Sequence, residues 1–184
     1  MSVTTVSSSM ITDATILNAD IGAAAAIATT KLGAGATVQV VTTLDSAVAT
    51  GTTLHINDDS VPTNAEGVAW SNLDTAITPT HASNILLIQC VLYCSHSAAA
   101  VMIGVLYQDS GAGLSSVGTY IDTGTAPEVL TLQYKMAAGT TSATTFKIRA
   151  GGHNGGTSTF NGTGGGRKFG GVAGSSMTIT EIKV

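Results

Sequence analysis

Charged residues are scarce in this sequence: Asp, Glu, Lys and Arg make up 10% of its 184 residues. Globular proteins ordinarily carry about a quarter charged residues. A chain that stands alone in water needs charge on its surface, so we expect much of this surface to be covered by other chains. The formal net charge of −4 offers no excess of positive charge for a phosphate backbone, which argues against nucleic acid as a partner.

Long apolar runs and export signals are also lacking. The sequence has no stretch of about 18 uninterrupted apolar residues, so we expect no membrane span. The first ten residues, MSVTTVSSSM, have neither the positive region nor the apolar region of a secretory signal. The two cysteines, Cys90 and Cys94, are four apart in a predicted strand, roughly 13 Å from each other. A disulfide requires Cα atoms within about 7 Å, so we predict free, buried thiols and folding in a reducing cytoplasm.

Signatures of catalysis, cofactor binding and metal binding are absent as well. The glycine-rich stretch 162–169 fails as a phosphate loop because Phe169, rather than Ser or Thr, follows Lys168. No nucleophile elbow occurs. No two histidines have the spacing of a zinc site, although one placed on a symmetry axis could bind a metal or an anion. The histidines are His55, His81, His96 and His153. We predict no enzyme activity, no cofactor and no metal site.

Two alternatives with carbohydrate chemistry are less favoured. A glycan-cleaving enzyme needs two carboxyl groups about 5–9.5 Å apart across a groove. The acids that such an enzyme would use are Asp58, Asp59, Glu66 and Asp74. A sugar-binding module needs exposed rings, and aromatic residues are only 4% of the chain. The rings that could serve are Tyr107, Tyr120 and Phe160.

Residues 1–50 differ from the rest because they contain no aromatic residue, no proline and little charge. Their first isoleucines recur every five residues, a spacing that matches neither a helix nor a strand. The alanine run at 23–28 is long enough for a turn or two of helix, which is marginal alone in water. We predict an extended or short-helical anchor or shaft that orders against other chains; the alternative is a disordered leader. The residues expected to pack between chains are Ile11, Ile16, Ile21, Ile27 and Leu32.

Residues 51–184 have the pattern of strands. The clearest strand, at 85–94, is apolar on both faces, so we expect one face to pack on a partner sheet and the other on another subunit. Further strands are predicted within 100–113, 128–141, 143–152 and 175–184, with shorter ones near 54–56, 68–77 and 117–121. About eight strands with glycine-rich turns and no convincing helix predict an all-β, antiparallel jelly-roll sandwich.

The segment ITDATILNADIGAAAAIATTKL resembles one found near the N-terminus of many bacteriophage tail-fibre and virion proteins. The positions that match are Asn18, Ala19, Asp20, Ile21, Ala25, Ile27, Ala28, Lys31 and Leu32. The later stretches VPTNAEGVAW, ITPTHASNILLIQC, VLYQDSGAG, MAAGTTSATTFKIRAGG and GGVAGSSMTITEIKV resemble the distal heads of such proteins. Those heads are similar in build to the trimeric jelly rolls of the C1q and tumour-necrosis-factor folds.

This resemblance implies a structural virion protein that forms a short homotrimeric fibre or spike. Residues 1–50 would anchor it to other virion proteins, and the head would be exposed on the particle and contact a glycan or protein of the host surface. The protein would be made in the cytoplasm of the bacterial host. A capsid decoration or head-fibre protein is the alternative. The loop residues we expect to face a receptor are His153, Asn154, Arg167 and Lys168.

Overall fold

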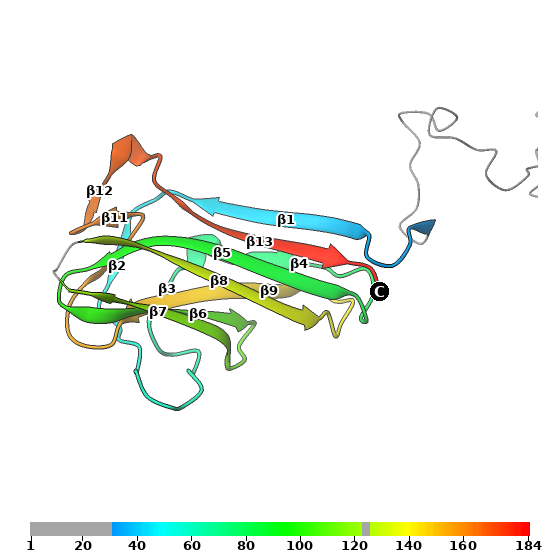
Figure 1. Cartoon of the computed structure of the whole chain (residues 1–184), viewed down its shortest axis with the longest axis horizontal. Helices are drawn as coiled ribbons and strands as arrows, with labels where there is room; N and C mark the ends of the chain where they lie inside the picture. The colour runs from blue at the N-terminus through cyan, green and yellow to red at the C-terminus, as the bar shows by residue number, and fades with distance from the viewer. Residues whose placement is uncertain (1–30, 123–125) are drawn as a thin grey trace, which may run out of the picture. The chain divides into compact units, whose positions relative to one another are not determined.

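A computed structural model describes residues 31–122 and 126–184 (Figure 1). The chain divides into two compact units, residues 1–32 and residues 33–184. Of the residues expected to pack between chains, Ile11, Ile16, Ile21 and Ile27 lie outside the described residues. The fifth, Leu32, is half-buried. The packing of this row stays a prediction.

Every described strand belongs to the second unit, and the described residues contain no α-helix. The strands are β1 Thr37–Asp45, β2 Ala49–Gly51, β3 Val68–Ala69, β4 Thr75–Ile77, β5 Ile85–His96, β6 Ala100–Gln108, β7 Gly113–Ile121, β8 Pro127–Ala137, β9 Thr144–Gly152, β10 Ser158–Phe160, β11 Gly162–Thr163, β12 Gly166–Arg167 and β13 Ser175–Ile182. Two 3₁₀ turns, η4 Ser71–Leu73 and η5 Phe169–Gly171, interrupt them.

The strands form two antiparallel sheets and one small hairpin. The first sheet has the order β1-β13-β5-β10-β2, with β8 also paired to β5. The second has the order β3-β9-β6-β7, with β4 also paired to β9, and β11 pairs with β12. Every pairing is antiparallel, which confirms the predicted all-β antiparallel sandwich.

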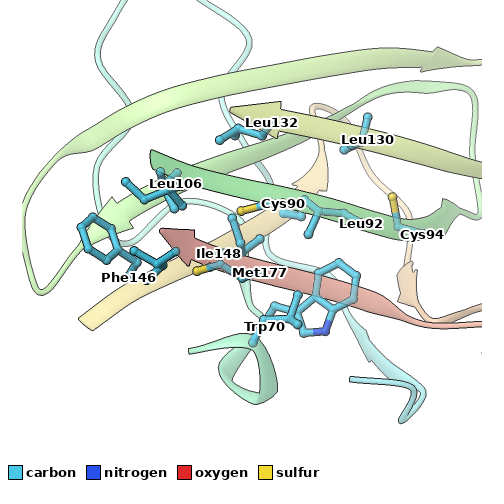
Figure 2. Packing of buried hydrophobic residues seen from close by; sticks show 14 of the residues in the cluster. Trp70, Cys90, Leu92, Cys94, Leu106, Leu130, Leu132, Phe146, Ile148 and Met177 are labelled. Atoms are coloured by element: carbon cyan, nitrogen blue, oxygen red, sulfur yellow. The ribbon is translucent and has the colours of Figure 1, made fainter. Parts of the chain in front are cut away.

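The core lies between the two sheets and follows the predicted alternation. In β5 the side chains of Leu86, Ile88, Cys90, Leu92 and Cys94 point inward and are buried. They pack against residues of β6, β9 and β13. Figure 2 shows Cys90, Leu92 and Cys94 among these buried side chains. The prediction of two free, buried cysteines is confirmed. Burial raises the pKa of each thiol to about 12, which makes both thiols unreactive at neutral pH.

The structure corrects two sequence-based expectations. The boundary predicted between residues 50 and 51 is too late, because β1 and β2 precede it and pair with β13 and β10 of the sheet. The strand predicted near 54–56 is a loop, although the backbone N–H of His55 still donates to the carbonyl of Gly152. Residues 37–45 are rich in Val and Thr, and the low-complexity residues before them contain both, so composition alone does not distinguish this strand from the N-terminal segment.

Strand directions define two ends of the sandwich. At one end Gly35 donates its N–H to the carbonyl of Lys183, so the start of this unit lies beside the C-terminus. Asp45, the last residue of β1, pairs with Ser175, the first residue of β13. The loop 161–174 that precedes β13 therefore lies at the opposite end, where Figure 1 shows β11 and β12. The turn 97–99 and the loop 153–157 lie there too, and we call this the far end.

The outward face of the second sheet is partly covered by the chain's own loop, residues 52–67. Tyr107 donates its hydroxyl to the carbonyl of Thr63, and Gly113 donates its N–H to the carbonyl of Pro62. Ile103, Val105 and Tyr107 consequently form a second, smaller buried cluster. This loop explains why β6 is apolar on both faces without needing another subunit.

Candidate functional site

Within residues 31–122 and 126–184, no loop covers the outward face of the first sheet, and its side chains form rows across four strands. Residues that lie opposite one another on neighbouring strands form these rows. Three rows begin at Val40, Thr42 and Leu44 of β1, and a shorter fourth row begins at Tyr93 of β5. In the order β1, β13, β5 and β8 the rows are Val40–Thr180–Leu87–Lys135, Thr42–Thr178–Gln89–Gln133 and Leu44–Ser176–Val91–Thr131, with Tyr93–Val129 between the last two strands. We call this surface the open face.

The open face combines exposed apolar side chains with almost no charge. Val40 is 56% exposed, Leu44 76%, Val91 44% and Val129 54%. Among the described side chains that form the rows, Lys135 is the one that carries a charge. Thr and Ser side chains of β13 stand between the apolar residues of β1 and those of β5, so the face mixes apolar with uncharged polar groups, a composition that suits an interface. The sequence predicts that this second face of β5 packs on another subunit, and that contact stays a prediction.

A polar row runs through the middle of this face. The hydroxyls of Thr42 and Thr178 are 3.1 Å apart and share a hydrogen bond. Gln89 lies directly opposite Gln133 on the neighbouring strand. Amide and hydroxyl groups can form hydrogen bonds across an interface without the cost of burying a charge. If the open face packs on another surface, such a row can fix how the two surfaces align, because hydrogen bonds are directional and apolar contacts are not.

The predicted loop residues His153 and Asn154 lie at the far end but have structural contacts. The backbone N–H of Val101 donates to Nδ1 of His153 at 2.8 Å, and Asn154 donates its side-chain amide to the carbonyl of Ala99 at 3.0 Å. These bonds tie the loop 153–157 to the β5–β6 turn. Both side chains hold the far end in shape.

Arg167 and Lys168 lie at the same end, and their side chains do not hold neighbouring segments in place. Both are exposed, and neither forms an ion pair or a side-chain hydrogen bond among the described residues. Next to them Phe169 is 72% exposed and adopts a positive φ of 48°. Val172, which follows two glycines, is 86% exposed. Sequence reasoning identified the two cations but missed the exposed apolar pair beside them.

A groove of about 390 Å³ opens at the base of this loop. It lies between the end of β1 and the start of β13 and is lined by Leu44, Asp45, Ser46, Gly171, Val172, Gly174, Ser175 and Ser176. Gly171 connects the groove to the cations, because a Cβ built on it would lie 2.9 Å from Cδ of Arg167. The aliphatic part of the Arg167 side chain thus lies against Gly171, at the groove's edge.

Buried hydrogen bonds fix the floor of the groove. The Asp45 carboxylate accepts from Nε1 of Trp70 at 2.9 Å, from Nδ2 of Asn161 at 2.8 Å and from the N–H of Ala47 at 2.9 Å. Asn161 in turn accepts from the hydroxyl of Ser175. Trp70 also stacks on Phe160, with ring centroids 4.2 Å apart. This network was not predicted, because its members are far apart in the sequence.

At the opposite end Glu181 is fully buried and has a similar role. Its carboxylate accepts from Gln39 and Asn84, both at 2.6 Å, and from the N–H and hydroxyl of Thr80. Burial acts to raise the pKa of Glu181, but the hydrogen bonds to its charged form outweigh burial and hold the pKa below its usual value. The two buried carboxylates therefore hold β1 and β13 at both ends.

Two histidine rings are buried against glycines: His96 against Gly152 at the end of β9, and His55 against Gly67. His96 shares a 3.1 Å hydrogen bond with Ser158, and its Nε2 has no hydrogen-bond partner. His55 donates from Nε2 to the carbonyl of Arg149 at 3.3 Å, and its Nδ1 is 3.9 Å from Glu66. Burial lowers the pKa of both imidazoles, so both are neutral at pH 7. Within residues 31–122 and 126–184, no three His, Cys, Asp or Glu side chains are grouped to hold a metal ion.

The carboxylates that a glycan-cleaving enzyme would use have local partners instead. Asp58 accepts from the N–H and hydroxyl of Ser60, and these bonds lower its pKa. Glu66 accepts from the N–H and hydroxyl of Thr63, and the pKa of Glu66 is lowered by the same contacts. A general acid needs a raised pKa. Desolvation does raise the pKa of Asp74, but the groove beside Asp58 and Asp59 does not include Asp74.

No protein-family model matches the sequence, and no curated protein matches it. Among solved structures, the chain is similar to one described as the infectious bursal disease virus Gt strain, at 13% identity and a TM-score of 0.42, over 82% of this chain and 39% of that chain. It is similar to dimeric latent PorU from Porphyromonas gingivalis, at 8% identity and a TM-score of 0.37, over 82% and 13% of the two chains.

A third similar structure is the enzymatically active domain of tailspike protein 4 from bacteriophage CBA120, at 16% identity and a TM-score of 0.29, over 67% of this chain and 19% of that chain. The chain therefore spans well under half the length of each of these proteins. TM-scores this low do not support an inference about function. In the described part of the chain, no helix has the length and apolar character to cross a membrane.

Proposed function

We propose that this protein is a structural virion protein of a bacteriophage, the head and anchor of a short homotrimeric fibre or spike. The observation that carries the proposal is the open face, with its exposed Val40, Leu44, Val91 and Val129 and its single charge at Lys135. The resemblance of the N-terminal segment and of the head to phage fibre proteins supplies the biological setting. Residues 1–50, which include β1, would then span both the anchor and the start of the head.

Self-association explains the composition of this face. The cores of protein interfaces are depleted of charge, while their rims are polar. Each valine that passes from water into a contact stabilises the assembly by roughly 1.5–3 kcal/mol when it is fully buried. The described part of the second sheet offers less of such a surface, because loop 52–67 covers Ile103, Val105 and Tyr107 and leaves Tyr120 of β7 exposed. The face that is left for another copy is therefore that of β1, β13, β5 and β8.

A threefold arrangement closes the assembly without an exposed repeat of this face. Three copies around one axis would bring their N-terminal segments together, which suits a row of isoleucines that a single chain cannot bury. Exposure of the far end, away from Gly35 and Lys183, suits contact with the host surface. A capsid decoration or head-fibre protein would share these features and differ in the site of attachment on the particle.

The test is a charge placed in the open face. Val91→Glu puts a carboxylate in the centre of the proposed contact and is expected to yield monomers in analytical ultracentrifugation. Val61→Glu is the matched control, since Val61 is 65% exposed on loop 52–67 and distant from the open face. If Val91→Glu leaves the sedimentation of the protein unchanged, the open face is not the contact. Imaging of the intact particle decides between tail and capsid attachment.

A further inference from the structure

Two adjacent cations lie exposed at the far end of a chain that is acidic overall. Arg167 and Lys168 are adjacent and exposed, while the formal net charge of the whole chain is −4. The acidic residues near the strand ends at this side are Asp45, whose buried carboxylate accepts hydrogen bonds from within the protein, Asp122 and Glu128, and among the described residues none of the three forms an ion pair with the two cations. Two unpaired cations at a protruding loop attract anions, and they do so more strongly at low ionic strength.

The loop holds these cations in a defined arrangement. Two backbone hydrogen bonds close the turn, from Gly171 to the carbonyl of Lys168 and from Val172 to that of Phe169. Gly170 and Gly171 have φ values of 64° and 90°, which a side chain would disfavour. Because Gly171 lacks a Cβ, the Arg167 side chain can lie against it. The guanidinium is thereby positioned beside the groove at the end of β1.

The groove supplies the other contacts that a sugar needs. Its hydroxyl group at Ser46 can donate and accept hydrogen bonds, and Val172 provides apolar surface, while Leu44 and Ser176 line the side that the groove shares with the open face. A volume of about 390 Å³ lies within the range of small-ligand pockets, roughly 300–1,000 Å³. The Asp45 carboxylate on the floor accepts four hydrogen bonds from groups of the protein itself. Its oxygens are therefore directed at these donors and not at the open part of the groove.

A contact with a second copy is a poorer match for this loop. If the loop lay on a threefold axis, three copies of Arg167 and Lys168 would meet there, and like charges brought together oppose association. An anionic ligand has the opposite effect, because the guanidinium can bind a carboxylate or a phosphate through two parallel hydrogen bonds.

We propose that the groove at residues 44–46 and 171–176, together with Arg167 and Lys168, binds an anionic saccharide, a sugar unit that carries a carboxylate or a phosphate. Arg167 engages the anion, Lys168 adds charge, and Phe169 and Val172 cover an apolar face of the sugar. This inference deepens the proposed function, on which it rests for its setting, by naming the class of host-surface ligand that the far end takes.

Titration calorimetry of the full chain tests the proposal with three probes: polygalacturonate for the carboxylate, polyglycerol phosphate for the phosphate, and dextran as the neutral polymer. We expect binding to at least one anionic polymer and none to dextran. Arg167→Ala with Lys168→Ala should weaken that binding by about tenfold or more, and added salt should weaken it further. The matched control is Lys147→Ala with Lys183→Ala, which removes the same charge at the opposite end of the sandwich.

Three results would overturn the proposal: no binding to either anionic polymer, equal binding to dextran, or unchanged binding by the Arg167/Lys168 double variant. A change in oligomeric state of that variant, without a change in affinity, would make the loop a contact between copies instead. The masses of the same samples separate this proposal from the preceding one. If the protein is a trimer but binds none of the probes, only the saccharide site is contradicted. If it is a monomer that binds them, only the trimer is contradicted.

Discussion

Nε1 of Trp70 donates a 2.9 Å hydrogen bond to Oδ2 of Asp45, and this contact joins the end of β1 to the core. Trp70 is the one tryptophan of the chain, and it stacks on Phe160 beneath the same carboxylate. Asp45 is thus the point at which the first strand, the stacked rings and the start of β13 meet. The strand that contributes Leu44 to the open face is fixed in place by this neighbour.

Replacement of Asp45 by alanine should destabilise the head. The change leaves the buried Nε1 of Trp70 without its acceptor and removes one of the two acceptors of the Asn161 amide, which keeps the carbonyl of Ala47; each unsatisfied donor costs about 1–3 kcal/mol. We expect the free energy of unfolding in urea to fall by roughly 2–5 kcal/mol. Asp59→Ala is the control, because Asp59 is exposed. An Asp45→Ala protein as stable as the Asp59→Ala protein would contradict this role.

Gly152 should tolerate no side chain. A Cβ at this position would lie 2.5 Å from Nε2 of the buried His96. Overpacking of this kind costs about 1–3 kcal/mol, so Gly152→Ala should lower the midpoint of thermal unfolding. Gly155→Ala is the matched control in the same loop, since no atom lies within 4 Å of its Cβ position. Equal midpoints for the two variants would show that His96 can move aside.

Stability should fall as the solution is acidified from pH 7 to pH 5. Burial lowers the pKa of His55 and His96 below the ordinary value of 6.5, although backbone hydrogen bonds partly offset this. The unfolded chain therefore takes up protons first, and the stabilisation present above pH 6.5 is lost as the pH falls through the folded pKa values. Glu181 affects stability at a lower pH. Its pKa is held below the ordinary value of 4.5, so the stability that its charged form contributes is lost only as the pH falls below 4.5. Urea unfolding at both pH values measures the loss, and greater stability at pH 5 would contradict it.

The sequence was informative where a strand has one buried face. The alternation in β5 and β8 separated Leu130 and Leu132 from Thr131 and Gln133, and the structure confirms which side is buried. It also placed the two cysteines inward and unpaired. Period-two alternation reports directly on burial, so these predictions needed no knowledge of the partner strands.

Contacts between distant residues were beyond sequence reasoning. Asp45 meets Asn161 across 116 positions, and Glu181 meets Asn84 across 97. No local pattern marks such pairs, and an acidic residue at a strand end is ordinarily solvated. The glycines after Ala150 were a usable signal, because consecutive glycines in a strand indicate a close approach by another group. At Gly152 that group is the buried ring of His96, and at Gly151 it is the backbone of the loop at Thr53.

The mass of the intact protein in solution tests the central claim most directly. Native mass spectrometry of the full chain, at micromolar concentration and physiological pH, is expected to give a species of three times the 18.3 kDa chain mass. Three copies would cover the open face that one copy leaves in water. A stable species at the mass of one chain, compact and soluble with Val91 still exposed, would contradict the account.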